Sequence, residues 1–162
     1  MSGFWRCAVY VAALGAAFFL VGRLMARHHF RPDAFPWKDY PFERKGALYR
    51  RLAIQRWQSL VPDMSRLFRK LMPPKRLAPG VTAAEVDRMV QETCVAEWTH
   101  IALSVLALGC LWLWPGWSGV AFYIVYTLLG NVLFILIQRY NRPRLVALAQ
   151  KLRAKERTGS RR

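Results

Sequence analysis

Hydrophobic residues are concentrated in three runs, and polar residues occupy the segments between them. The longest charge-free stretch, residues 98–138, contains no Asp, Glu, Lys or Arg and reads Trp-Pro-Gly-Trp at residues 114–117. Each half has about 17–20 residues, enough to cross a hydrocarbon core, and Trp residues beside a Pro-Gly turn are typical of a membrane interface. The pattern therefore predicts a transmembrane hairpin with helices over residues 98–115 and 118–138.

A shorter apolar run lies at the start of the chain. It covers residues 7–22 and is flanked by Arg6 and Arg23. This length also fits the apolar region of a signal peptide, but no small-x-small cleavage motif follows the run. We therefore predict a retained transmembrane helix over residues 7–25, with residues 1–25 acting as a transmembrane helix or an uncleaved signal-like anchor.

The segment between the first and second runs predicts elements at the membrane surface. Residues 30–43 hold three Pro and five aromatic residues, which favours an extended segment along the interface over a helix. Two later stretches have apolar residues at helical spacing, as in basic amphipathic helices on an anionic leaflet or, alternatively, in packing between soluble helices. Their apolar residues are Tyr49, Ala53, Trp57 and Leu60 in the first stretch, and Met64, Leu67, Phe68, Leu71 and Met72 in the second.

A break and a new helix start precede the hairpin. Proline and glycine residues make residues 73–81 a linker, and Thr82-x-x-Glu85 is a capping box that predicts a helix running into the second span. The sequence thus predicts an all-α integral membrane protein with about three transmembrane helices and basic amphipathic interfacial helices. After the amino-terminal anchor we expect three segments: a basic cytoplasmic or interfacial segment over 26–81, the helix and hairpin over 82–145, and a basic tail over 146–162.

Composition and charge narrow the classes of function. With 54% hydrophobic and 14% aromatic residues among 162, the chain is too apolar for a disordered protein, and the apolar runs leave too little sequence for a soluble multidomain enzyme. Of the 25 Lys and Arg residues, 24 lie in residues 23–88 and 139–162. A topology with three spans places both of these segments on the same side of the membrane. The positive-inside rule makes that side cytoplasmic, so the net charge of +16 indicates anionic lipid as the partner rather than nucleic acid.

Titratable residues at the entrance to the second span are candidates for chemistry. Glu92, Glu97 and His100 fall on one half of the helix, with His100 between the two carboxylates in angle. A neutral imidazole with a carboxylate one turn away can take a proton from a hydroxyl. Glu-x-x-His is half of a carboxylate-bridged metal motif, but no second copy exists and the three Cys residues form no Cys-x-x-Cys pair, so we expect no metal site unless two chains associate.

The hairpin also predicts which residues of its two arms lie at the same depth. A pivot near Ser118 would pair His100 with Leu136, Glu97 with Arg139, and Glu92 with Arg144. Asn131 is the one amide inside the third span, so it is either a site residue or a hydrogen-bonding contact between helices. At the end of that span, Pro143 is expected to force Arg142 out of helical geometry. The Arg and Tyr residues there fit an interfacial belt or, alternatively, a guanidinium cluster that binds phosphates.

Three motifs in this order resemble a known family. The run Gly130-Asn131-Val132 followed by the string IQRYNRPRL at residues 137–145 is similar to the carboxy-terminal motif of the glycosyl-diaponeurosporenoate acyltransferase family. Phe42-Glu43-x-x-Gly46 followed by Arg56-Trp57 resembles an earlier motif of that family. Glu92-Thr93-x-x-Ala96-Glu97-x-x-His100 resembles a third, so the resemblance covers about residues 40 to 150.

The resemblance implies a membrane O-acyltransferase that esterifies a sugar hydroxyl of a glycosylated carotenoid or related glycolipid. His100 would be the base, and Glu97 and Glu92 would orient it. The residues that would line the site or bind the acyl donor are Asn131, Gln138, Arg139, Asn141, Arg142 and Trp57. No cofactor is expected beyond an acyl donor as co-substrate, either acyl-CoA or acyl carrier protein.

The same resemblance implies a location and partners. The chain would be a multi-pass protein of the bacterial inner membrane, in contact with membrane lipids and a lipid-soluble glycosylated acceptor, and a second copy is a possible partner. Two alternatives remain open from the residues alone. Cys94 is a weaker candidate that would form an acyl-enzyme, since it lies about 120° from His100 around the helix. A non-enzymatic membrane scaffold or partner subunit would also have this distribution of charge.

Overall fold

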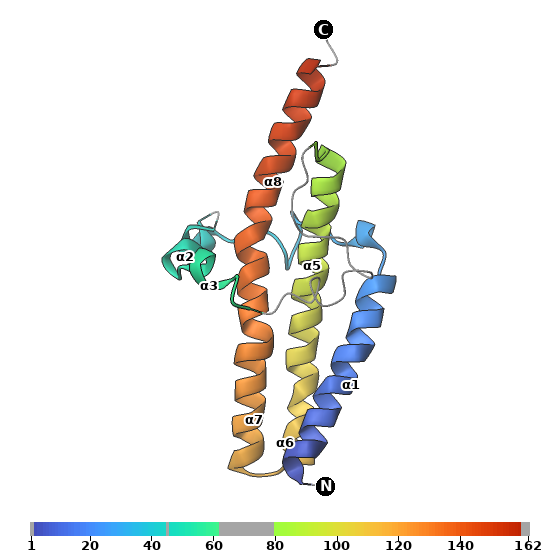
Figure 1. Ribbon diagram of the computed structural model, residues 1–162, viewed down its shortest axis with the longest axis vertical. Coiled ribbons are helices and arrows are strands. Elements are labelled where there is room, and N and C mark those ends of the chain that lie inside the picture. Colours follow the sequence, from blue (N-terminus) through green and yellow to red (C-terminus); the bar gives the residue numbers. More distant parts are fainter. Residues whose placement is uncertain (1, 45, 62–79, 160–162) are drawn as a thin grey trace. The chain divides into compact units, whose positions relative to one another are not determined.

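The computed structural model describes residues 2–44, 46–61 and 80–159 (Figure 1). These residues form helices, turns and loops, and no strand occurs among them. Three helices are long and apolar enough to cross a membrane, and they cover Gly3–Leu24, Ala83–Leu113 and Trp117–Thr158. The prediction of an all-α protein with three candidate transmembrane helices is therefore confirmed. The amphipathic helix predicted over residues 64–72 and most of the linker 73–81 lie outside the described residues.

The chain forms two compact units. Unit 1 comprises Met1–Phe30 and Cys94–Gln138, and unit 2 comprises Arg31–Thr93 and Arg139–Arg162, in each case for the residues that the structure describes. Both units are therefore built from two stretches that are distant in sequence. Each contains one of the polar clusters described below.

Unit 1 begins with helix α1, Gly3–Leu24, which starts four residues before the predicted span. Between Arg6 and Arg23 its residues are largely apolar around the circumference, and only Cys7 is buried, as in a helix that faces lipid on most sides. α1 packs against α6 (Cys110–Leu113) and α7 (Trp117–Thr127), near the amino-terminal end of the chain (Figure 1). An edge-to-face pair of Phe4 and Phe122, with centroids 5.7 Å apart, belongs to this contact.

The hairpin of unit 1 turns a few residues earlier than the pivot predicted near Ser118. Its first arm is α5 (Ala83–Leu106), the 3₁₀ turn η3 (Ala107–Gly109) and α6. The chain reverses at Pro115-Gly116, where Gly116 has a φ of 98°, and α7 has already begun at Trp117. The predicted pivot at Ser118 is therefore wrong, because Ser118 belongs to the first turn of α7. The positive φ that closes the reversal falls on Gly116, which can adopt it because glycine has no Cβ.

Gly119 makes the closest approach in the hairpin turn. A Cβ added to Gly119 would lie 1.8 Å from the backbone oxygen of Trp114, so the backbone itself would have to move. We expect Gly119→Ala to lower the free energy of unfolding by about 1–3 kcal/mol or more, as overpacking against backbone does. Thermal unfolding of the purified protein in detergent checks this. The control is Ser118→Ala, an exposed neighbour in the same turn, and an equal loss in both variants would contradict the explanation.

The second arm of the hairpin contains an irregular turn. α7 passes into the π-helical turn η4 (Leu128–Val132) and then into α8 (Leu133–Gly159). The prediction that Pro143 forces Arg142 out of helical geometry is wrong, because both residues lie inside α8. A proline removes one backbone hydrogen bond and crowds the preceding turn. Here the side chain of Arg142 makes several buried hydrogen bonds in unit 2, described below, and they offset that cost.

Unit 2 contains short helical elements before α5. Residues 31–40 contain successive turns and are followed by the 3₁₀ turn η2 (Pro41–Glu43), so the extended segment predicted over 30–43 is wrong, although no α-helix forms there. The helix expected through Tyr49 and Leu60 is divided into α2 (Ala47–Arg51) and α3 (Ile54–Trp57). Ala53 separates them with a φ of 51°. As a result Tyr49 and Ile54 are buried, while Leu60 is 81% exposed.

The start of α5 agrees with the capping prediction. The backbone N–H of Thr82 donates to Glu85 Oε2 at 2.8 Å, and the backbone N–H of Glu85 donates to Thr82 Oγ1 at 3.3 Å. These reciprocal bonds form a capping box, and the helix begins at Ala83 directly after the cap. The helix start could therefore be read from the sequence.

Candidate functional site

The polar cluster of unit 1 joins His100 to Asn131. His100 lies on α5, and Asn131 lies in the π-helical turn η4 with 1% of its surface exposed. The distance from His100 Nδ1 to Asn131 Oδ1 is 3.0 Å, a hydrogen bond. The His100 ring also stacks on Phe134, with centroids 4.7 Å apart and planes 11° from parallel. The imidazole is thus held on one edge by an amide and on one face by an aromatic ring.

This hydrogen bond fixes the protonation pattern of the imidazole. An amide oxygen can only accept a hydrogen bond, so Nδ1 carries the proton. In a neutral imidazole Nε2 is then the basic nitrogen. Hydrolases with a catalytic triad use the same arrangement, in which one ring nitrogen donates to an orienting group and the other accepts the proton of the nucleophile. The pair can therefore act as a general base with a defined tautomer.

The π-helical turn explains why the hairpin pattern missed this pair. The pivot predicted Leu136 at the level of His100, and this prediction is wrong, because Asn131 and Phe134 contact the ring. The actual reversal at Pro115-Gly116 shifts the pairing toward smaller residue numbers, and the wider π turn changes the spacing further. Single π turns inside α-helices occur frequently at functional sites.

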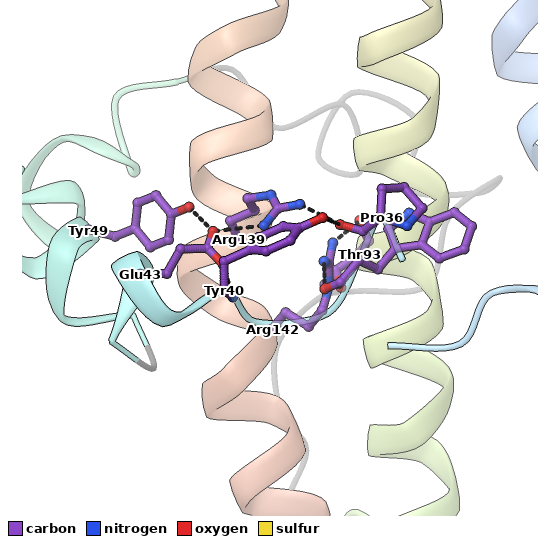
Figure 2. A network of polar contacts seen from close by, with 8 residues as sticks. Pro36, Tyr40, Glu43, Tyr49, Thr93, Arg139 and Arg142 are labelled. Carbon is purple, nitrogen blue, oxygen red and sulfur yellow. Dashed lines mark hydrogen bonds and ion pairs between the residues drawn. The ribbon is translucent and has the colours of Figure 1, made fainter. Parts of the chain in front are cut away.

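The polar cluster of unit 2 is organised by two arginines of α8 (Figure 2). Arg139 Nη1 donates to Glu43 Oε1 at 2.7 Å, and Nη2 donates to the backbone oxygen of Pro36 at 2.7 Å. The guanidinium also lies over the ring of Tyr40, 5.1 Å from its centroid. Arg139 therefore contacts both ends of the segment that runs from Pro36 to Glu43.

Glu43 is the acceptor at the centre of this cluster. It is 2% exposed and accepts hydrogen bonds from the Tyr49 hydroxyl and, at 2.7 Å, from the backbone N–H of Tyr40. Burial raises the pKa of Glu43, but the bonds from Tyr49, Tyr40 and Arg139 outweigh it and hold the pKa below its ordinary value. Burial and the Glu43 carboxylate together raise the pKa of Tyr49. Glu43 is therefore stabilised as a buried carboxylate.

Arg142 binds a neighbouring part of the same segment. It is 4% exposed, and its Nε donates to Thr93 Oγ1 at 2.9 Å. Nη2 donates to the backbone oxygen of Thr93 at 3.2 Å, and Nη1 donates to the backbone oxygen of Trp37 at 2.8 Å. The guanidinium thus connects α8, α5 and the turn at Trp37 (Figure 2).

The other predicted site residues lie on α3, α5 and α8. Glu97 is 1% exposed and lies on α5 three residues before His100, and Glu92 is half-buried on the same helix. Gln138 is 9% exposed, and Asn141 is half-buried. The indole N–H of Trp57 donates to the backbone oxygen of Leu52 at 3.0 Å. The orienting role of the two glutamates and the binding roles of the other residues stay predictions.

The sequence pattern also missed residues of the unit 2 cluster. Glu43 belongs to the Phe42-Glu43-x-x-Gly46 motif, so the motif pointed to this residue. Nothing in the motif indicated that its partner is Arg139. Gly46 has a φ of 82°, and a Cβ at this position would lie 3.4 Å from Pro143 Cγ. The motif therefore sets the local backbone geometry that places Glu43 against Arg139 of α8 within unit 2.

Within residues 2–44, 46–61 and 80–159, no group of three or more His, Cys, Asp or Glu side chains could hold a metal ion. Cys94, the alternative nucleophile, is fully buried.

Comparison with known proteins adds a family to these observations. Residues 30–151 match the family model described as glycosyl-4,4'-diaponeurosporenoate acyltransferase. A protein of that name from Staphylococcus aureus strain MRSA252 is 28% identical over 150 residues, which cover 91% of this chain and 88% of the relative. Its counterpart in strain Newman is 27% identical over 151 residues, 92% of this chain and 89% of the relative. No solved structure matches the chain.

Proposed function

Because the chain belongs to the glycosyl-4,4'-diaponeurosporenoate acyltransferase family, we propose that it transfers a fatty acyl group to a sugar hydroxyl of a glycosylated carotenoid or related glycolipid. The observation that carries this proposal is the hydrogen bond from His100 Nδ1 to Asn131 Oδ1, which supplies a base in a defined tautomer. His100 Nε2 takes the proton of the sugar hydroxyl as its oxygen attacks the acyl carbonyl. Acyl transfer needs this proton removal, and no cofactor other than the acyl donor is required.

The acyl donor in this proposal is a thioester, acyl-CoA or acyl carrier protein. His100 lies three residues beyond Glu97, a rise of about 4.5 Å along α5, so it follows closely on the last charged residue of that helix. A hydroxyl at headgroup depth and an acyl chain in the hydrocarbon can meet at such a boundary. The distribution of basic residues supports a cytoplasmic position for this boundary in a bacterial inner membrane.

Unit 2 supports the proposal through its segment 36–43. The described bonds of Arg139 and Arg142 go to protein groups, so these arginines contribute by fixing the segment. The aromatic side chains of Phe35 and Phe42 are 76% and 65% exposed, and both suit contact with lipid headgroups and chains. We expect membrane lipids to cover these rings.

The experiment that tests the function is a comparison of lipids from cells with and without this protein. Cells that make the glycosylated carotenoid should convert it to a product heavier by one fatty acyl residue only when the protein is expressed. Mass spectrometry of extracted lipids measures the shift. An unchanged glycolipid profile would contradict the proposal and favour a non-enzymatic scaffold.

A further inference from the structure

Asn131 carries a buried donor that the protein leaves unused. Among the residues that the structure describes, two buried side-chain polar atoms have no hydrogen-bond partner, Asn131 Nδ2 and Thr127 Oγ1. Tyr126 lies close enough to interact with Asn131, but no hydrogen bond of ordinary distance and angle reaches Nδ2. Buried polar groups are almost always hydrogen-bonded, so an unpaired amide N–H inside a span requires an explanation.

The unused donor lies beside the proposed base. Oδ1 and Nδ2 of Asn131 belong to one planar amide, and Oδ1 accepts the bond from His100 Nδ1. The bond fixes the plane of the amide, and burial to 1% exposure holds it in place. The N–H group is therefore preorganised next to the imidazole, in a stretch of chain without any charged residue.

We propose that Asn131 Nδ2 donates a hydrogen bond to the carbonyl oxygen of the acyl thioester as that oxygen becomes an oxyanion. Asn131 is then a catalytic residue with two roles, since Oδ1 orients the base and Nδ2 stabilises the charge that develops. This inference rests on the proposed acyl transfer. A donor that is already oriented in a medium of low polarity stabilises an oxyanion far more than a donor in water does.

In the proposed acyl transfer, the bond formed to the sugar oxygen is matched by the bond broken to the thioester sulfur. His100 Nε2 accepts the proton of the sugar hydroxyl, and the hydroxyl oxygen forms a bond to the thioester carbonyl carbon. The π electrons of the carbonyl move to its oxygen, which accepts the bond from Asn131 Nδ2. When the tetrahedral intermediate collapses, the carbon–sulfur bond breaks and the thiolate leaves with the proton from His100. The products are the ester and the free thiol.

Asn131→Asp tests the second role separately from the first. Aspartate has the same shape and still accepts the bond from His100 Nδ1, but it has no N–H to donate. We expect the kcat of the purified protein to fall about 10²–10³-fold with little change in KM, as when other enzymes lose one oxyanion donor. If Asn131 only orients His100, Asn131→Asp keeps its kcat, and that result would overturn the inference.

The matched control is Thr127→Val, which removes the other unpaired buried polar atom. Thr127 takes no part in the hydrogen bond between His100 and Asn131, so its variant should transfer acyl groups at the wild-type rate. An equal loss in both variants would mean that general disturbance of η4 lowers activity, and it would overturn the assignment. If wild type and Asn131→Asp transfer equally while His100→Ala transfers nothing, the inference fails and the proposed function stands. If wild type transfers nothing, the proposed function itself fails.

A measurement on the wild-type protein keeps the inference testable should Asn131→Asp not fold. The chain has only two asparagines, Asn131 and Asn141, so side-chain ¹⁵N labelling of asparagine gives two amide signals, and Asn141→Gln identifies them. The probe is a fatty acyl trifluoromethyl ketone, whose tetrahedral hydrate places an oxygen where the oxygen of the thioester carbonyl would lie. We expect the Asn131 amide signal to shift downfield on adding the probe. A bound probe without that shift would overturn the inference.

Discussion

His100→Ala should lower the rate of acyl transfer by about 10²–10⁴-fold, because it removes the only group in the His100–Asn131 pair that can accept a proton. The helices of unit 1 should remain, since His100 is half-buried and alanine is a strong helix former. The measurement is the initial rate of ester formation by the purified protein in detergent, with a glycolipid acceptor and an acyl thioester. Circular dichroism of the same sample checks that the helices are retained.

His100→Gln is the informative control for this prediction. Glutamine can donate a hydrogen bond to Asn131, but it has no basic nitrogen at neutral pH. An enzyme that uses His100 as a base therefore loses activity in both variants. A scaffold that uses His100 only to join two helices would tolerate His100→Gln. Undiminished transfer by either variant would remove His100 from the mechanism.

The three spans could be predicted because composition alone determines them. A stretch as long as residues 98–138 without charge has no stable place outside an apolar medium, and Pro115-Gly116 marks where it must reverse. The depth pairing could not be predicted in the same way. An error of a few residues in the pivot moves every partner along the helix, and the π turn at residues 128–132 has no signature in the hydrophobic pattern. Asn131 was therefore recognised as a candidate, but not as the partner of His100.

The end of the third span shows how tertiary contacts override a local rule. Pro143 disfavours helical geometry at Arg142 when the chain is considered alone. In unit 2, the buried bonds from Arg142 to Thr93 and Trp37 hold the residue inside α8. These partners are about 50 and 100 positions away in sequence, so no local pattern could reveal them. The same distance hid the ion pair between Glu43 and Arg139.

Glu43→Ala should lower the free energy of unfolding by about 3–5 kcal/mol, the usual cost of removing one partner from a buried ion pair. Glu43 is 2% and the Arg139 side chain 14% exposed, so solvent screens the pair weakly. The substitution also removes the acceptor of Tyr49 and of the Tyr40 backbone. Denaturant titration of the purified protein in detergent measures the loss. The control is Asp33→Ala, which breaks the exposed pair with Arg31 and should leave the denaturation curve essentially unchanged.

The loss of unfolding free energy caused by Glu43→Ala should depend on pH, and the lowered pKa of Glu43 in the folded protein determines the direction of that dependence. Folding holds the pKa of Glu43 below its ordinary value, so the folded protein binds this proton less readily than the unfolded chain does. The carboxylate therefore contributes fully above the unfolded pKa, about 4.3, and its contribution is lost as pH falls through the lower folded value. The stability difference between wild type and Glu43→Ala should accordingly be constant near neutral pH and shrink in acid. A difference that grew as pH fell would mean that burial outweighs the bonds from Tyr49 and Arg139, which would contradict the role of Glu43 as a buried carboxylate.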